Sequence, residues 1–104
     1  MARTFGKTIS EARKRLCISQ KELASRVKKD DGSEISAQYL NDIEHDRRNP
    51  PAEIMIVQFA DELQLDRDYL CMIAGSIPKD ILEKVLRSSD EHVSREIKAF
   101  RKKL

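Results

Sequence analysis

The sequence predicts an all-α protein, in which a compact group of five helices is followed by one or two C-terminal helices. Apolar residues recur at intervals of three or four along most of the 104-residue chain, which is the spacing of one helical face. Only three Gly, three Pro and no Trp are present, a composition that disfavours turn-rich sandwiches and barrels. Ser or Asp precedes several of the periodic segments, where its side chain can cap a helix.

The first two helices are predicted between residues 5 and 27. The inward residues of the first helix are Phe5, Ile9, Ala12 and Leu16. Ser19 opens the second helix within the stretch SQKE, where Glu22 can return the capping bond. The inward residues of the second helix are Leu23, Ala24 and Val27. The small side chain of Ala24 permits close approach of another helix.

A charged loop and a short third helix come next. The loop is residues 28–34, KKDDGSE, which contains an Asp-Gly turn signal. Ser36 caps the third helix, and Leu40 and Ile43 form its inner face. Pro50 and Pro51 forbid its continuation, because proline has no backbone N–H and clashes with the preceding turn.

Two further helices complete the compact group. The fourth is expected over about residues 52–63. Its inward residues are expected to be Ile54, Val57, Ala60 and either Phe59 or Leu63. The fifth is capped by Asp66 and stops near Gly75. Its apolar residues are Tyr69, Leu70 and Ile73.

The helical pattern restarts after residue 75, so residues 1–75 are predicted to form one domain and residues 76–104 a helical extension. Pro78 opens a helix, and Ser88 with Glu91 predicts the start of another. The apolar residues of the first are Ile81, Leu82, Val85 and Leu86. The stripe on the second is Val93, Ile97, Phe100 and Leu104. This stripe either contacts another chain, as a dimer or partner surface, or packs back onto the same chain.

Several function classes are disfavoured. No apolar run approaches the ~20 residues of a membrane span, and no secretory signal is visible, so a soluble cytoplasmic protein is expected. Cys17 and Cys71 are interpreted as buried, reduced thiols, because they have no CxxC partner. The chain has only two histidines, His45 and His92, and no phosphate loop or nucleophile motif. Neither a catalytic residue nor a metal or other cofactor is therefore predicted.

Charge is distributed unevenly around a net value of +2. Residues 1–29 carry nine Lys or Arg, whereas residues 30–46 carry six acids and no Lys or Arg. Arg47 and Arg48 follow at once, and residues 87–104 are basic again. This alternation can concentrate positive potential on one face of the molecule.

Three stretches together resemble the helix-turn-helix domain of phage repressors and Cro, the xenobiotic-response-element family of transcription regulators. They are SQKELASRV at residues 19–27, ISAQYLNDIEHDRRNPP at 35–51 and IVQFADELQLDRDYL at 56–70. The resemblance covers about residues 5–75. It implies a repressor-like regulator of bacterial or phage origin, associated with the nucleoid, that binds double-stranded DNA as a homodimer.

The resemblance also implies roles for individual residues. In this family the third helix lies in the major groove and the second crosses the DNA backbone. The positions implied to contact bases are Ala37, Gln38, Asn41 and Asp42. The positions implied to contact phosphates are Gln20, Ser36, Arg47, Arg48 and Asn49. Arg13 and Glu44 are implied to form a structural ion pair between the first and third helices.

The side-chain chemistry of the third helix agrees with base contact. Gln38 and Asn41 each carry a donor and an acceptor that match adenine, and ionised Asp42 can accept from cytosine N4. Ala37 can touch a thymine methyl group. The alternative is an ordinary solvated helix face, and for Asp42 the two interpretations are evenly balanced.

The loop before the third helix departs from the family pattern. Between Ala24 and Ile35 the chain has about six residues more than the usual compact turn. The extra residues include three acids, which phosphates would repel, so we expect the loop to point away from DNA or along its rim. Lys28 and Lys29 at its base can still approach the backbone.

Two other functions compete with a regulator. An antitoxin of a toxin-antitoxin pair would keep the same DNA-binding domain and hold its protein partner with the tail after residue 76. RNA binding is disfavoured, because the aromatic residues on which single-stranded bases stack are scarce.

Overall fold

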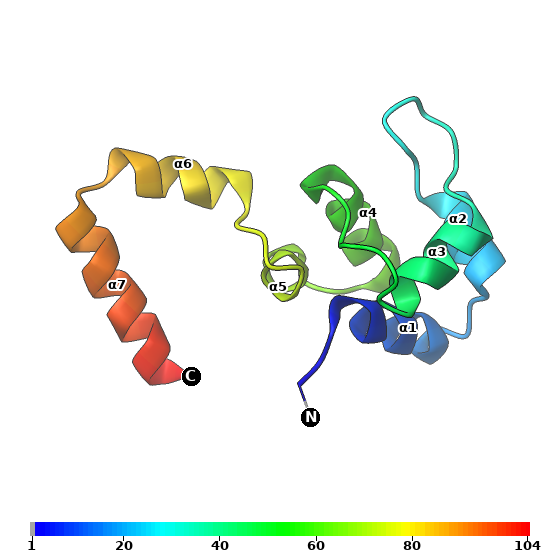
Figure 1. Cartoon of the computed structure of the whole chain (residues 1–104), viewed down its shortest axis with the longest axis horizontal. Coiled ribbons are helices and arrows are strands. Elements are labelled where there is room, and N and C mark those ends of the chain that lie inside the picture. The colour runs from blue at the N-terminus through cyan, green and yellow to red at the C-terminus, as the bar shows by residue number, and fades with distance from the viewer. Residues whose placement is uncertain (1) are drawn as a thin grey trace.

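The computed structural model describes residues 2–104, which form seven α-helices and no β-strand (Figure 1). The helices are α1 (Phe5–Arg15), α2 (Gln20–Arg26), α3 (Ala37–Glu44), α4 (Glu53–Leu63), α5 (Arg67–Ile73), α6 (Lys79–Arg87) and α7 (Asp90–Lys103). The predicted all-α class, with five helices followed by one or two more, is confirmed, and the C-terminal extension contains two helices. None of these helices is both long enough and apolar enough to cross a membrane.

Side-chain caps fix the starts of most helices. The side chains of Ser19, Ser36 and Asp66 each accept a bond from the backbone N–H three residues later, as predicted for α2, α3 and α5. The predicted start of α7 is wrong by one residue. Ser89 caps that helix, whereas the hydroxyl of Ser88 donates to the carbonyl of Lys84 at the end of α6.

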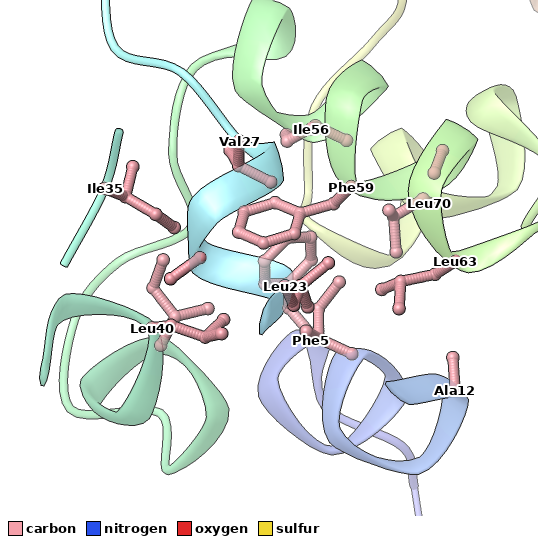
Figure 2. Close-up of a cluster of buried hydrophobic side chains, with 14 of the residues drawn as sticks. Phe5, Ala12, Leu23, Val27, Ile35, Leu40, Ile56, Phe59, Leu63 and Leu70 are labelled. Carbon is pink, nitrogen blue, oxygen red and sulfur yellow. The ribbon is translucent and has the colours of Figure 1, made fainter. Parts of the chain in front are cut away.

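One apolar core lies among the first five helices (Figure 2). Its largest fully buried side chains are Phe59, Ile9, Leu23, Leu40, Ile43, Ile56, Leu70, Val27 and Cys71. The predicted inner face of α4 is partly wrong, because Ile54 is 70% exposed and Val57 is half-buried. The buried face instead comprises Ile56, Phe59, Ala60 and Leu63, which have the i, i+3, i+4, i+7 spacing of one helical stripe.

The two cysteines have different environments. Cys71 is buried in α5, as predicted, and burial raises the pKa of its thiol, with the nearby carboxylates of Glu53 and Asp68 raising that pKa further. The prediction for Cys17 is wrong, because it is exposed. Cys17 follows the end of α1 with a left-handed φ of 58°, and this turn of the chain directs its side chain away from the core.

The segment between α2 and α3 is an ordered hairpin. Lys28 and Glu34 form an antiparallel bridge, and the tip turns at Gly32, whose φ is +84°. The side chain of Gln58 on α4 accepts from the backbone N–H of Lys28 at 2.7 Å and donates to its carbonyl at 2.9 Å. The hairpin projects beyond the body from the α2–α3 end (Figure 1).

The C-terminal arm, residues 76–104, contributes no residue to the core. Neither α6 nor α7 contains a buried residue, and both lie apart from the first five helices, with α6 running away from them and α7 turning down from its far end (Figure 1). The arm is joined to the body at the start of α6, where Pro78 is buried and the N–H of Lys79 donates to the carboxylate of Glu53 at 2.9 Å. The exposed apolar faces of this arm have no partner within residues 2–104.

Gly6 allows α1 to approach the end of α3. The backbone N–H of Gly6 donates to Asp46 Oδ1 at 2.9 Å, and the hydroxyl of Thr4 donates to Asp46 Oδ2 at 2.6 Å. A Cβ added to Gly6 would lie 2.7 Å from the carbonyl oxygen of Glu44 and would also collide with that of Ile43. The backbone of α3 cannot yield as a flexible side chain would.

We therefore expect Gly6→Ala to lower the free energy of unfolding by about 2–3 kcal/mol, the upper part of the range for overpacking. Chemical denaturation followed by circular dichroism measures this change. Lys7→Ala, on an exposed position of the same helix, is the matched control and should change stability by less than about 0.5 kcal/mol. Equal stability of the two variants would contradict the close approach.

Candidate nucleic-acid interface

Helix α3 is held on one side and free on the other. Leu40, Ile43 and Glu44 are buried against α1 and α2. On the opposite side, Ala37 and Gln38 are exposed, and Asn41 and Asp42 lie at the half-buried edge. The apolar spacing of three residues therefore fixes which way α3 faces, and the outer side presents amide and carboxylate groups to solvent.

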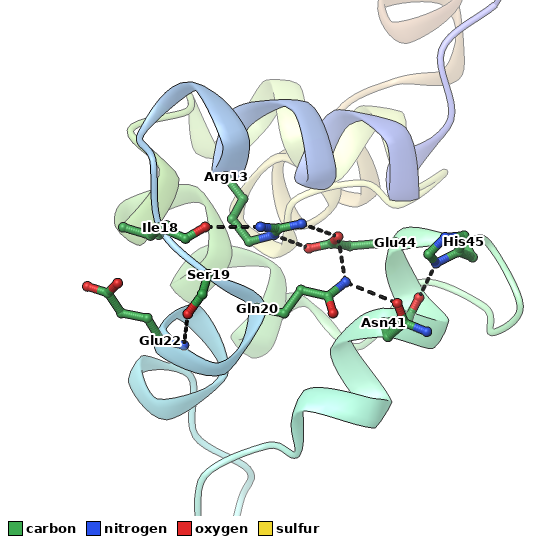
Figure 3. Close-up of polar contacts among 8 residues, drawn as sticks. All are labelled: Arg13, Ile18, Ser19, Gln20, Glu22, Asn41, Glu44 and His45. Atoms are coloured by element: carbon green, nitrogen blue, oxygen red, sulfur yellow. Dashed lines mark hydrogen bonds and ion pairs between the residues drawn. The ribbon is translucent and has the colours of Figure 1, made fainter.

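A polar network joins the first three helices (Figure 3). Arg13 on α1 donates to both carboxylate oxygens of Glu44 on α3, at 2.7 and 2.9 Å, and to the carbonyl of Ile18 at 3.0 Å. Gln20 on α2 donates from Nε2 to Glu44 Oε1 at 2.9 Å and to Asn41 Oδ1 at 3.1 Å. The side chains of Arg13 and Glu44 are only 12% and 2% exposed, so solvent screens this pair weakly.

The protonation states of this network are set by the pairing. Burial by itself raises the pKa of Glu44, but the hydrogen bonds from Arg13 and Gln20 outweigh burial, and the net pKa lies below the ordinary value. The hydrogen bond to Glu44 raises the pKa of Arg13, against the opposing effect of burial. Both groups are therefore ionised at neutral pH.

The free side of α3 carries a second charged group. Asp42 accepts from Gln38 Nε2 at 3.0 Å and lies 3.5 Å from a guanidinium nitrogen of Arg47 and 3.6 Å from that of Arg48. Arg48 also stacks over the ring of Tyr39, with 5.0 Å between the guanidinium carbon and the ring centroid. The two arginines are thus kept beside the end of α3 while more than half of each side chain stays exposed.

The structure brings most of the predicted interface residues to one region. The four candidate base-contacting positions lie on α3 or at its edges, Ser36 caps its start, and Arg47, Arg48 and Asn49 are exposed just beyond its end. Gln20 is half-buried, and its amide nitrogen is already used to join α2 to α3. Any contact of Gln20 with phosphate therefore stays a prediction.

Several contacts were not predicted from the sequence. Among them are the Arg48–Tyr39 stack and the attachment of Asp46 to the start of α1. The position of Asp46 carried a signal, because a carboxylate beyond the C-terminus of a helix opposes the helix dipole and indicates a partner elsewhere. Among residues 2–104, no group of three or more His, Cys, Asp or Glu side chains is arranged to hold a metal ion.

The geometry defines the class of protein. Two short helices, α2 and α3, are joined through Gln20, with Arg47 and Arg48 just beyond the end of the second and its polar side open. This is the arrangement of a helix-turn-helix DNA-binding domain. A family model described as helix-turn-helix matches residues 9–70, which is more than half of the chain.

The chain therefore belongs to this helix-turn-helix family of Cro and XRE type, and it is a DNA-binding transcriptional regulator. No curated protein and no solved structure was found to match the chain significantly.

Removal of Glu44 tests the network that orients α3. Glu44→Ala leaves the Arg13 guanidinium unpaired in a site that is largely closed to water, so we expect a loss of about 3 kcal/mol of stability at pH 7. DNA binding should weaken as a consequence of the disturbed fold. If thermal stability stayed unchanged while binding vanished, the structural assignment of Glu44 would be wrong.

The same pair predicts a pH dependence. A carboxylate with a lowered pKa stabilises the folded state fully above its unfolded value, near 4.5, and this stabilisation disappears as the pH falls through the lower folded value. The stability difference between wild type and Glu44→Ala should thus be constant from pH 7 to about 5 and shrink below about pH 4. Urea titrations across that range measure it. A stability difference that grew towards acid pH would contradict the lowered pKa of Glu44 in the folded state.

Proposed function

We propose that the chain is a sequence-specific repressor that binds double-stranded DNA as a homodimer, with α3 in the major groove, in the cytoplasm and on the nucleoid. The observation that carries this proposal is the polar outer side of α3, which is open to solvent while its inner side is locked by the core and by Arg13 and Glu44. A helix held in this way can enter a groove about 12 Å wide without rearrangement of the fold.

Base reading is assigned to the outer side of α3. Gln38 and Asn41 offer amide groups that suit adenine, Asp42 offers an acceptor for an exocyclic amino group, and Ala37 offers a methyl group. Asn41 accepts from Gln20 through Oδ1, so its own NH₂ group is left to donate. This orientation favours an acceptor on the base edge opposite Asn41.

Phosphate contacts are assigned to both ends of α3 and to α2. Arg47 and Arg48 supply charge-assisted bonds, and Asn49 lies exposed beside them. Ser36 at the start of α3 and Gln20 at the start of α2 are assigned to the backbone at the other end, where Gln20 would have to exchange its side-chain bond to Asn41 or Glu44 for one to a phosphate. These contacts position the helix but carry no sequence information themselves.

The C-terminal arm is assigned to dimer formation, because one domain covers only about half of a symmetric site. Ile97, Phe100 and Leu104 are 49%, 51% and 89% exposed, and an apolar groove of about 360 Å³ lies between α6 and α7. Helix α7 begins with Asp90 and Glu91 and ends with three basic residues. Antiparallel pairing of two copies of α7 would therefore place opposite charges together and bury the stripe.

An antitoxin function is the alternative, since the same uncovered groove between α6 and α7 would suit an apolar segment of a toxin. The basic C-terminal end of α7 would then require an acidic partner surface. A pulldown with the arm deleted, beside the full chain, distinguishes this case from self-association.

Base reading and backbone contact predict different consequences of mutation. Gln38→Ala should relax preference at one base pair in each half-site, with a loss of about 1–3 kcal/mol at the preferred site. Arg47→Ala should weaken binding to all sequences alike and reduce the salt slope by about one unit. Selection from random duplexes, followed by salt titrations, measures both. Uniform weakening by Gln38→Ala would contradict base reading.

The dimer is tested by Phe100→Asp, which places a charge within the proposed interface. We expect a monomer in analytical ultracentrifugation, with the helical content of the first five helices preserved. Arg95→Gln, at an exposed position on the side of the same helix opposite the stripe, is the control and should stay dimeric. If the Phe100 variant remained a folded dimer, the stripe would be excluded as the interface.

A further inference from the structure

The carboxylate of Asp42 contacts three candidate DNA-contacting side chains, those of Gln38, Arg47 and Arg48. We propose that Asp42 determines how much more tightly the protein binds its operator than other DNA. It would do so by orienting Gln38 and by weakening the binding of any duplex that offers no amino group to its carboxylate. This inference rests on the proposed function of α3 and assigns a specificity-determining role within it.

The first part of the proposal follows from the Gln38–Asp42 contact. These residues are four apart on α3, so their side chains lie one turn from each other on the same side of the helix. Gln38 donates one amide hydrogen to Asp42 at 3.0 Å, which leaves its other N–H and its carbonyl oxygen for a base. A side chain restrained in this way loses less conformational entropy when it pairs with a base edge.

The second part follows from the charges. In the free protein the negative charge of Asp42 is offset by Arg47 and Arg48, at 3.5 and 3.6 Å. When those arginines turn to phosphates, the carboxylate loses both partners while it faces a polyanion. A base pair that presents an amino group to Asp42 restores a hydrogen bond, and other base pairs do not. The electrostatic cost of Asp42 therefore depends on sequence.

A structural role does not account for Asp42. The Asp42 side chain is 20% exposed, but its two arginine partners are 58% and 56% exposed, and at 3.5 and 3.6 Å these partly solvated contacts contribute little to stability. Asp42 is also not part of the Arg13–Glu44 network, which fixes α3 from the other side. A carboxylate on the DNA-facing side is thus a cost to affinity without a matching gain in stability, which is what a selectivity device requires.

The experiment compares binding to the selected operator and to a duplex of unrelated sequence. For Asp42→Asn, which keeps an acceptor for Gln38 but removes the charge, we expect binding to the unrelated duplex to tighten about fivefold. The operator should gain less, so that the ratio of the two affinities falls about three- to fivefold. The salt slope on the unrelated duplex should steepen by up to about one unit. Unfolding should be unchanged.

A second variant separates orientation from charge. Asp42→Ala removes the acceptor as well, so it should additionally relax the base preference that Gln38→Ala relaxes, whereas Asp42→Asn should retain it. Asp68→Asn makes the same change in net charge on exposed α5, away from α3, and should leave the affinity ratio unaltered.

Failure of this inference can be distinguished from failure of the proposed function. If the wild-type chain bound no duplex at low ionic strength, the DNA-reading role of α3 and this inference would fail together. If the wild type bound its selected operator but Asp42→Asn left the affinity ratio within twofold of wild type, or changed it no more than Asp68→Asn, only the role of Asp42 would be overturned.

Discussion

The buried contact between Arg13 and Glu44 is the interaction on which the rest of the domain depends. It joins α1 to the end of α3, and Gln20 extends it to α2 through the same carboxylate. Three short helices that would be marginal alone are thereby held at fixed angles. Because Glu44 is satisfied on the inner side of α3, the outer side needs no contact within the chain and remains available to a ligand.

The fold was largely predictable, because capping residues and apolar spacing act locally. Ser19, Ser36 and Asp66 mark helix starts correctly, and the inner faces of α1 to α3 follow directly from spacing. The errors have both tertiary and local causes. Ile54 lies in an apolar run that fits more than one face, and only packing against α1 and α5 selects the face that contains Phe59. The end of α1 turns Cys17 outwards through a backbone conformation that composition does not reveal.

The positions of the candidate interface residues were predictable from the sequence, but the contacts among them were not. The side chains expected on the outer side of α3 lie there, whereas the convergence of Gln38, Arg47 and Arg48 on Asp42 depends on how the chain leaves the helix. Turn signals predicted a loop at residues 28–34 but not an ordered hairpin, because Gln58, thirty residues away in sequence, bonds both the N–H and the carbonyl of Lys28 at its base. In the arm formed by α6 and α7, the periodicity predicts an apolar stripe, but neither the sequence nor the structure of residues 2–104 indicates what covers it.

The central claim is that α3 occupies the major groove of a duplex. Methylation protection by dimethyl sulfate tests it most directly, because this reagent reports guanine N7 in the major groove and adenine N3 in the minor groove. The account predicts protection of guanine N7 in two patches about one helical turn apart on the selected operator, with adenine N3 unaffected between them. Protection confined to adenine N3, or none at either atom on DNA that is demonstrably bound, would contradict it.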